Sequence, residues 1–565
     1  MAPHRIRNDL ASRAIPGPNA PRILFIGAGS QGHAYAEPIV RLGLGHVVAV
    51  ADPIPLKRQE LFGQKYIWGI HDRNALPHEE FEDWQSFVKY EIKRRERLAA
   101  GEISEDDAEF KGVDSAFICV LDEMHVHVIK ALVPLGIHIM CEKPLATTLE
   151  DCTGILGAVT KEWEVLGRKS IFGIGHVLRY SSYNVKLRQL VREQKTIGDL
   201  ISIEHTEPIG WWHMAHSFVR GNWRRQDTTG PILLTKSCHD IDFLMWLVAS
   251  PTSPSNSEPP HLPSYISSSG HLNHFRKARK PAAAGNATNC LSCPIESTCI
   301  YSSKNIYINK LLDVEDLDWP LPTVVPEIED IYKAKGKEDA KQRLLEALGE
   351  DYTPDTPDSV IKQRPWFGRC VWECDNDVND DQTVTISWED DPLPPAQENG
   401  TFNGTNNGVV ESRDGAKEQV RGDASGLTGR AAKTAIFHMT APTELICERR
   451  GRIYGTTGEI TYDSTTISVH SFATGKTVKY VPEVRGIGHG GGDEWLAENF
   501  CKAVEQVNAG GAVEEAQKQW LGVSIEEIVR SHVAVFAAER ARTERSVVDW
   551  RKFWREEVER HVIKA

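Results

Sequence analysis

The sequence predicts an α/β protein with two domains: a doubly wound parallel sheet, then an α+β domain with an open, mainly antiparallel sheet. Up to about residue 178, short apolar runs alternate with helical patterns, which is typical of parallel strands joined by helices. Beyond residue 179, the strands become longer and alternate between apolar and polar residues. A chain of 565 residues is long enough for two or three domains.

The first domain is predicted to span residues 21–178, behind a flexible tail at 1–20. A charged segment at about 77–109, rich in Glu, Lys and Arg, is expected to be a helical insertion with a solvated face. Elsewhere the apolar patterns predict strands at 22–26, 46–51, 114–120, 138–141 and 170–176, and helices at 33–42, 124–135 and 149–166.

The second domain is predicted to span residues 179–555, with a cysteine-containing insertion at about 285–375. Residues from about 391 to 433 are mostly Gly, Asn, Pro, Asp and Ser, so we expect a disordered loop there. The alternating patterns fit an open sheet with helices on one face. They predict strands at 200–209, 382–388, 434–440, 452–454, 459–462 and 465–472.

A glycine-rich turn, Gly27-x-Gly29-x-x-Gly32, joins the first strand to the first helix. In this setting Gly27 allows a tight turn, Gly29 lets the backbone approach a pyrophosphate, and Gly32 allows close packing of helix on strand. The phosphates would lie at the helix N-terminus, beside Ser30 and Gln31. The pattern predicts a Rossmann dinucleotide-binding domain, with a purely structural turn as the alternative.

Asp52 closes the second strand, twenty residues after Gly32. A carboxylate there accepts hydrogen bonds from ribose hydroxyls and repels a 2′-phosphate, so the sequence favours NAD over NADP. Arg58, six residues further on, could reach a phosphate, which leaves NADP open. Asp122 and His125, after the third strand, are expected to line the cofactor cleft, with a helix cap as the alternative for Asp122.

Composition excludes several function classes. A net charge of −14 and a pI near 5.9 argue against sequence-independent binding to nucleic acid or to an anionic membrane. The sequence contains no apolar stretch of about eighteen residues and no signal-peptide pattern at its start. Eleven cysteines in such a chain indicate reduced thiols, so we expect a cytoplasmic protein.

The run Glu142-Lys143-Pro144 follows the strand at 138–141, at the edge where parallel sheets bind ligands. It puts a lysine where such a sheet would hold a nicotinamide. Oxidation of a carbinol requires a base that titrates near neutrality. Because a nearby cation lowers the pKa of a lysine, Lys143 beside Lys236 or His239 would meet that condition. A surface lysine after a turn is the alternative.

Four motifs together resemble the Gfo/Idh/MocA oxidoreductases, of the glucose–fructose oxidoreductase and inositol dehydrogenase type. The resemblance covers about residues 22–549. It implies an N-terminal Rossmann domain that binds NAD and a C-terminal domain whose sheet often forms a dimer interface, so we expect a homo-oligomer. The motifs are the glycine turn, Glu142-Lys143-Pro144, residues 232–242 followed by Trp246-Leu247, and Gly455-Thr-Thr-Gly458-Glu459.

The resemblance also implies roles for single residues. Lys143 would contact the nicotinamide ribose and take part in proton transfer. Glu142 and Pro144 would lie at the cofactor beside it. His239 would act on the hydroxyl group of the substrate, although a core histidine at a helix start is the alternative.

The sequence departs from the family pattern just before His239. Relatives usually carry an aspartate four residues earlier, where this chain has Thr235, and Lys236 follows it. We expect the charge of Lys236 to take over part of that aspartate's role, which makes it a third catalytic candidate. Asp240 and Asp242 are expected to point away from the helix face that carries His239.

Residues 207–224 are dense in aromatic, imidazole and guanidinium groups. Trp rings stack on the apolar faces of sugars, and Arg and His bind hydroxyls or carboxylates, so the segment predicts a binding loop for a sugar or polyol. A packed aromatic loop between the domains is the alternative. The substrate-binding candidates are Arg179, Trp212, His213, His216, Arg220, Asn222 and Arg224.

The insertion contains Cys290-x-x-Cys293-x5-Cys299, and Cys370 and Cys374 follow. Three clustered thiolates plus one distant ligand could form a tetrahedral structural zinc site. Buried reduced thiols and an iron–sulfur cluster are the alternatives.

Together these features predict an NAD(P)-dependent oxidoreductase that transfers hydride between nicotinamide and a CH–OH group of a sugar, polyol or related compound. Two alternatives stay open. One is an NAD-dependent glycosidase that works by elimination, and the other is a non-catalytic dinucleotide-sensing regulator.

Overall fold

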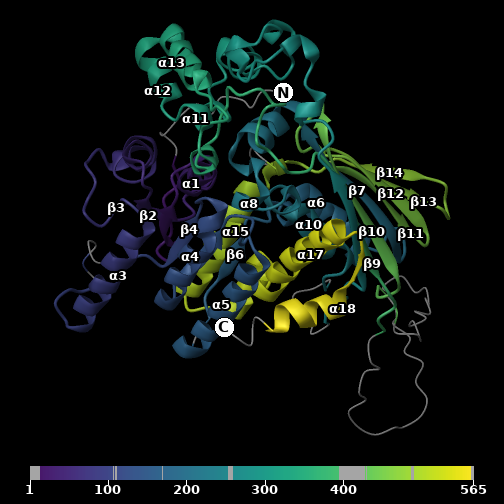
Figure 1. The fold of residues 1–565 in the computed structure, drawn as a ribbon. Helices are drawn as coiled ribbons and strands as arrows, with labels where there is room; N and C mark the ends of the chain where they lie inside the picture. The colour runs from purple at the N-terminus through teal and green to yellow at the C-terminus, as the bar shows by residue number, and fades with distance from the viewer. Residues whose placement is uncertain are drawn as a thin grey trace, which may run out of the picture.

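The framework of the protein consists of two sheets, one with six strands and one with nine (Figure 1). The structure, a computed structural model, describes residues 13–105, 107, 111–167, 169–251, 259–392, 427, 429–484 and 489–560. Most of the tail predicted at 1–20 and most of the loop predicted at 391–433 lie outside the described residues. The structure confirms the expected fold class, a parallel sheet followed by a mainly antiparallel sheet.

The six-stranded sheet is parallel throughout, in the order β3-β2-β1-β4-β5-β6. All residues of β4 and β5 are buried, as expected where helices cover both faces of a sheet. The strands are β1 (Arg22–Ile26), β2 (His46–Ala51), β3 (Glu80–Phe81), β4 (Ser115–Ile118), β5 (His138–Cys141) and β6 (Phe172–Ile174). The helices of this domain are α1 (Ser30–Leu42), α2 (Gln64–Tyr66), α3 (Trp84–Ala99), α4 (His125–Leu132) and α5 (Leu149–Leu166).

The segment expected to be a helical insertion at 77–109 differs in part, because it contains β3 before α3 begins. Two residues are too few to show the period of a strand in a sequence. Tertiary contact decides the conformation here: the ring of Phe81 packs edge-on against Phe87 of α3, with the centroids 5.4 Å apart.

The nine-stranded sheet has the order β14-β13-β12-β11-β7-β10-β9-β8-β15. β7 and β10 pair in parallel, and the other neighbours are antiparallel. The strands are β7 (Leu200–Gly210), β8 (Tyr265–His271), β9 (Asp381–Trp388), β10 (Lys433–Thr443), β11 (Arg450–Gly455), β12 (Gly458–Tyr462), β13 (Ile467–Ser471), β14 (Thr477–Tyr480) and β15 (Val547–Asp549).

Three of these strands were not expected from the sequence. β8 contains three serines and a glycine, which have weak strand propensity, and it forms because β9 and β15 pair with it on either side. β14 and β15 are short strands at the two edges of the sheet. Partner strands, rather than local sequence, determine all three.

Helices from distant parts of the chain join the two sheets. In Figure 1, α17 (Ile525–Glu544) crosses the middle of the molecule, where it packs on α5, α10 and β8. The ring of Phe500 in α15 packs edge-on against Phe117 of β4, at 5.2 Å. The remaining helices are α6 (Ser182–Arg188), α7 (Trp211–His213), α8 (Gln226–Thr229), α9 (Ile232–Thr235), α10 (Cys238–Val248), α11 (Leu321–Val324), α12 (Ile328–Lys335), α13 (Lys337–Gly349), α14 (Asp358–Lys362), α15 (Gly492–Asn508), α16 (Val513–Ala516) and α18 (Trp550–Phe553).

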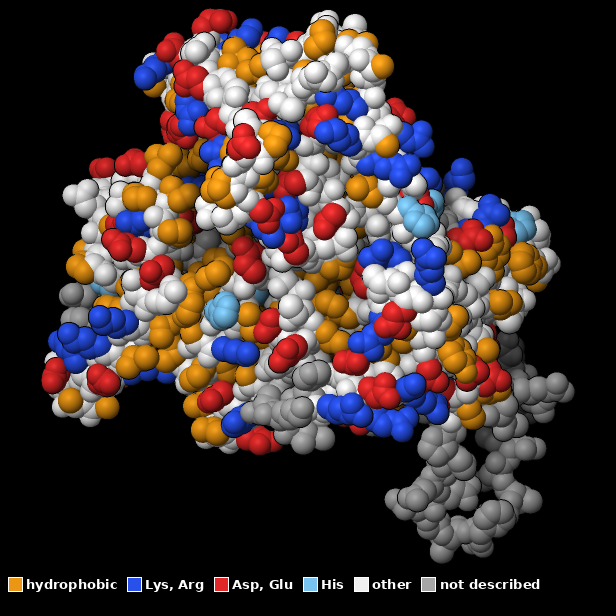
Figure 2. All heavy atoms as spheres, in the orientation of Figure 1, with side chains coloured by type: hydrophobic (Ala, Val, Ile, Leu, Met, Phe, Trp, Pro, Cys, Tyr) orange, Lys and Arg blue, Asp and Glu red, His pale blue; other side chains and the backbone are white. Residues whose placement is uncertain are grey.

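The face of the molecule in Figure 2 carries interspersed acidic and basic side chains. Among the described helices, none combines the length and the apolar character that a bilayer span requires.

The contact between α15 and the six-stranded sheet can be tested with Phe500→Ala. Both Phe500 and Phe117 are fully buried, so we expect the free energy of unfolding in urea to fall by about 3–5 kcal/mol. Phe472, which is 57% exposed, is the control, and Phe472→Ala should change stability by less than about 0.5 kcal/mol. A similar small loss for both variants would contradict this packing.

Candidate functional site

The glycine turn between β1 and α1 leaves space for a ligand at one position only. A Cβ on Gly27, whose φ is +101°, would lie 2.3 Å from the carbonyl oxygen of Cys119, and a Cβ on Gly32 would lie 2.4 Å from that of Gly27. At Gly29, by contrast, no described atom lies within 4 Å of the Cβ position. Because α1 starts at the next residue, the exposed Ser30, this space lies at a helix N-terminus, which suits a phosphate.

Asp52 lies beside this turn at the end of β2. Its Oδ2 accepts a hydrogen bond from the backbone N–H of Ala28 at 2.9 Å, and its Oδ1 accepts one from Ile54. Arg58 donates from Nε to Oε1 of Glu80 at 2.7 Å and from Nη1 to the carbonyl oxygen of Asp52. The charge of Arg58 is therefore paired within the protein.

Gln31, the second residue of α1, is turned toward the C-terminal part of the chain. Its Nε2 donates to Oδ1 of Asp493 in α15 at 3.0 Å. The residue after Ser30, at the predicted phosphate site, is thus hydrogen-bonded to α15. The same helix packs on β4 through Phe500.

The turn after β5, residues 142–145, is held on several sides. Glu142 accepts a hydrogen bond from the hydroxyl of Tyr35 in α1. His125 of α4 donates from Nδ1 to the carbonyl oxygen of Pro144 at 2.7 Å. The backbone N–H of Leu145 donates to Nε2 of His532 in α17 at 2.9 Å.

Lys143, at the centre of this turn, is half-buried and reaches toward the second domain. Its Nζ donates to the carbonyl oxygen of Thr235, the last residue of α9, at 2.5 Å. It is close enough for its charge to affect the pKa values of Asp122 and His239. The structure therefore brings together the lysine and the histidine that the sequence singled out.

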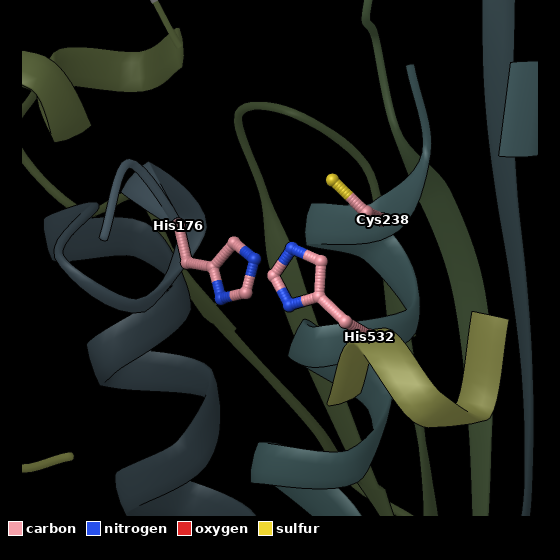
Figure 3. A group of neighbouring side chains, drawn as sticks. All are labelled: His176, Cys238 and His532. Atoms are coloured by element: carbon pink, nitrogen blue, oxygen red, sulfur yellow. The ribbon is translucent and has the colours of Figure 1, made fainter. Parts of the chain in front are cut away.

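A group of His176, Cys238 and His532 lies next to this turn (Figure 3). Among the described residues, it is the one group of three potential metal-ligating side chains whose ligand atoms all lie within 4.8 Å of one another. Nε2 of His532 accepts from Leu145, and its Nδ1 donates to the carbonyl oxygen of Ile528 at 2.8 Å. Both ring nitrogens of His532 are therefore in use. The stacked rings of His176 and His532, 5.1 Å apart, support the turn rather than bind a metal.

His239, in the first turn of α10, is buried and hydrogen-bonded to Arg449. Nη2 of Arg449 lies 2.7 Å from Nε2 of His239, and because a guanidinium can only donate, Nε2 is the acceptor. Burial, together with the charges of Arg449 and Lys143, holds the pKa of His239 well below its usual value. The imidazole is therefore neutral and carries its proton on Nδ1.

Asp240 does not point away from His239, which corrects our expectation. Its Oδ2 lies 3.3 Å from Nε2 of His239, and its Oδ1 accepts from Nε of Arg449 at 2.5 Å. The expectation failed because Arg449 bridges the two neighbouring side chains. Burial alone would raise the pKa of Asp240, but the charge of Arg449 holds it well below its usual value. Asp242 does turn away, toward Arg179.

Lys236 is buried in the same network. Its Nζ lies 3.1 Å from Oε1 of Glu207 and donates to Sγ of Cys447 at 3.0 Å. Burial lowers the pKa of Lys236, but the facing Cys447 and Glu207 more than offset this and raise it above its usual value. Lys236 is therefore a protonated counter-ion of Glu207, whose Oε2 also lies 3.1 Å from Nε of Arg449.

Our sequence reasoning missed Glu207, Arg449 and Cys447. The sequence did contain a signal for Glu207. In β7, the side chains of Ile203, His205 and Glu207 alternate onto the same buried face, and a charged residue on a buried face needs a partner. We find no comparable local signal for Arg449, which lies just before β11.

The segment at 207–224 packs mainly against the cysteine-containing insertion. His216 is buried, stacks on Phe367 at 4.9 Å, and forms a 2.8 Å hydrogen bond through Nδ1 with the hydroxyl of Tyr307. Nε of Arg224 donates to Asp375 at 2.7 Å. Arg220 is fully buried, and its Nε donates to the carbonyl oxygen of Arg369. These contacts favour the packing alternative for all three residues.

Other residues of the 207–224 segment contact the first domain or pack among themselves and against Trp319. Nε1 of Trp223 donates to Oδ2 of the buried Asp122 at 2.9 Å, at the carboxyl edge of the parallel sheet. Trp212 and His213 pack against the ring of Trp319. Asn222, in the same turn as Trp223, is half-buried. A ligand role for these residues stays a prediction.

Arg179, the first residue of the second predicted domain, forms a buried ion pair within that domain. Its Nε and Nη2 donate to the two carboxylate oxygens of Asp242 at 2.6 and 2.7 Å, and its Nη1 donates to Glu527 at 2.9 Å. These charges raise the pKa of Arg179 in spite of its burial. The guanidinium joins α10 and α17.

Comparisons with known proteins agree with this geometry. Residues 21–167 match a family model described as an oxidoreductase family with an NAD-binding Rossmann fold. The chain is similar to inositol 2-dehydrogenase 2 of Saccharopolyspora erythraea, at 28% identity over 25% of this chain and 36% of the relative. It is similar to 1,5-anhydro-D-fructose reductase of Ensifer adhaerens, at 28% identity over 24% of this chain and 38% of the relative. The chain thus covers less than two fifths of either protein.

A solved structure of levoglucosan dehydrogenase in complex with NADH and levoglucosan covers far more of the chain. It matches 94% of this chain and 98% of its own, with a TM-score of 0.51 and 15% identity. At this identity, the match shows a shared fold.

The buried His532 predicts a pH dependence of stability. Burial lowers the pKa of His532 to about 3, whereas the unfolded chain titrates near 6.5. Between those values the unfolded state binds more protons, so stability should fall as pH decreases, by up to about 1.4 kcal/mol per pH unit. Urea unfolding from pH 7 to 5 should show a shallower slope for His532→Gln. The exposed His271→Gln is the control, and equal slopes for all three proteins would contradict the prediction.

Proposed function

We propose that this protein is an NAD-dependent oxidoreductase of the Gfo/Idh/MocA family acting on CH–OH groups, because residues 21–167 match the model of that family. The observation that carries the proposal is the approach of Lys143 to the start of α10. Its amine bonds the carbonyl oxygen of Thr235, four residues before His239, and its charge affects the His239 imidazole. A lysine and a neutral histidine thus converge at the carboxyl edge of the parallel sheet, where ligands bind.

The residues around the glycine turn fit NAD. The space at Gly29, the exposed N-terminus of α1 at Ser30, and the carboxylate of Asp52 suit a pyrophosphate and a ribose. When bound, NAD supplies the hydride acceptor for the reaction. The pairing of Arg58 with Glu80 supports NAD over NADP, because Arg58 is then not a free cation for a 2′-phosphate.

In this proposal, Lys143 accepts the proton of the substrate hydroxyl. His239 holds the substrate oxygen as a hydrogen-bond donor, because Arg449 occupies Nε2 and leaves the proton on Nδ1. Arg449 and Asp240 thereby act as positioning residues in place of the aspartate that relatives carry. Lys236 balances Glu207 and positions Arg449 through it.

The substrate class rests on the relatives. One is named an inositol dehydrogenase, another an anhydrofructose reductase, and the structural match is a levoglucosan dehydrogenase. All three names denote polyhydroxylated rings, so we infer a sugar or polyol substrate. Of the substrate-binding candidates in residues 207–224, we assign contact with the substrate to Trp212, His213 and Asn222, because the contacts of the others favour a packing role.

We also propose a homo-oligomer and a cytosolic location. In β9, the residues on one face are buried and those on the other are half-exposed, so the second face of the sheet is available to a partner. None of the eleven cysteines, all of them among the described residues, forms a disulfide, which suits a reducing compartment.

Cofactor choice tests the role of Asp52. Calorimetry should show tighter binding of NAD(H) than of NADP(H), and Asp52→Asn should narrow the difference because it removes the charge that repels the 2′-phosphate. Glu82→Gln removes an exposed carboxylate of the same domain and is the control. Tighter NADP(H) binding by the unmodified protein would refute the assignment.

Lys143→Ala tests the proton-transfer role. On a substrate found by screening sugars and polyols for NAD reduction, kcat should fall by about 10²–10⁴-fold, while the Kd for NAD changes little because the glycine turn holds the pyrophosphate. The exposed Lys479→Ala should keep full activity. Nearly full turnover by Lys143→Ala would sink the proton-transfer role of Lys143.

A further inference from the structure

Four cysteines of the insertion line one small cavity. Cys290, Cys293, Cys299 and Cys370 surround a space of about 20 Å³, together with Arg220 and Tyr301. An antiparallel bridge between Asn289 and Arg369 brings the two distant parts of the chain together. The fourth cysteine, eighty residues from the first, is therefore placed by the fold.

Backbone N–H groups are directed at two of these sulfur atoms. The N–H of Tyr301 is directed to Cys299, and the N–H of Trp372 is directed to Cys370. In each case the donor lies two residues after the cysteine. Hydrogen bonds to sulfur are a recurring feature of thiolate-ligated metal centres, where they adjust the properties of the metal.

Arg220, in the wall of the same cavity, is a buried cation that needs a counter-charge. Its Nη2 donates to the carbonyl oxygen of Tyr301 at 2.7 Å and lies 3.4 Å from Sγ of Cys290. Its Nη1 has no hydrogen-bond partner among the described residues, and no described carboxylate lies within 4.0 Å of the guanidinium. A buried charge is stable only when it is paired.

The groups that can supply the negative charge are the thiols themselves. Cys290 contacts Arg220, and Cys293, Cys299 and Cys370 line the same cavity. A cysteine thiol with an unperturbed pKa of about 8.5 is mostly neutral at pH 7. Binding to a metal deprotonates cysteine, so a thiolate-bound metal centre would balance Arg220.

We propose that Cys290, Cys293, Cys299 and Cys370 bind an iron–sulfur cluster, with Arg220 as its buried counter-ion. Four cysteines are the ligand set of the common clusters with two or four irons. The cluster would also fix residues 214–220 to the insertion, because Arg220 ends that turn.

The spacing of the sulfur atoms favours a cluster over the zinc ion that the sequence suggested. A zinc ion with bonds of about 2.3 Å places its four sulfurs about 3.8 Å apart, with no room for a water molecule between them. Here the cavity has that room. Among the described residues, the one group of three ligand atoms within 4.8 Å of one another is the histidine–cysteine group of Figure 3, so in any three of these sulfurs at least one pair lies more than 4.8 Å apart.

The experiment is metal and sulfide analysis of the full-length protein, purified without oxygen and without chelators. We expect iron and acid-labile sulfide in equal amounts, about two or four of each per chain, and visible absorption that bleaches with dithionite. One zinc per chain without iron would overturn the proposal. Protein free of both metals would also overturn it.

Variants show which residues hold the cluster. Cys290→Ser and Cys299→Ser should lose most of the iron and sulfide, and full retention by both would overturn the ligand assignment. Cys374→Ser is the matched control, because Cys374 directs its thiol to the carbonyl oxygen of Cys370 and does not line the cavity. It should keep the iron. In Arg220→Met, any cluster retained should have a more negative midpoint potential, since a nearby cation stabilises the added electron. An unchanged potential would overturn the role of Arg220.

Discussion

The turn at residues 142–145 is the constraint on which the arrangement of the candidate site depends. Hydrogen bonds from Tyr35 in α1 and His125 in α4, and one to His532 in α17, hold it on three sides. Because its backbone is held in this way, the Lys143 side chain is directed across to α9. α17 also packs on α10, which carries His239, so one helix sets the positions of both catalytic candidates.

A buried charge network orients the histidine. Three ion pairs join two anions, Glu207 of β7 and Asp240 of α10, to two cations, Lys236 before α10 and Arg449 before β11. Removal of one member would leave an unpaired buried charge, which is far more costly than the net gain from an intact pair. The network therefore couples the nine-stranded sheet to the imidazole. It also explains how His239 can be held although Thr235, and not an acidic residue, stands four residues earlier.

The aromatic segment after β7 and the cysteine insertion form one structural unit. His216, Arg220 and Arg224 all turn toward residues 290–375, while Trp223 reaches Asp122 at the edge of the first domain. The insertion thus acts on the candidate site indirectly, because it determines where the segment between them lies. Residue types that suit sugar binding are here used largely for packing, since guanidinium and indole groups serve both purposes equally well.

The sequence by itself determined five strands of the parallel sheet, the glycine turn at Gly27 to Gly32, and the places of Asp52 and Lys143 at strand ends. These features depend on short contiguous patterns, in which strand, turn and helix follow one another within a few residues. Only the tertiary structure decided the partner of His239, the packing role of Arg220 and the fourth cysteine at 370. Each of these joins residues 70 or more apart in the chain, and a single sequence carries no local pattern for such contacts.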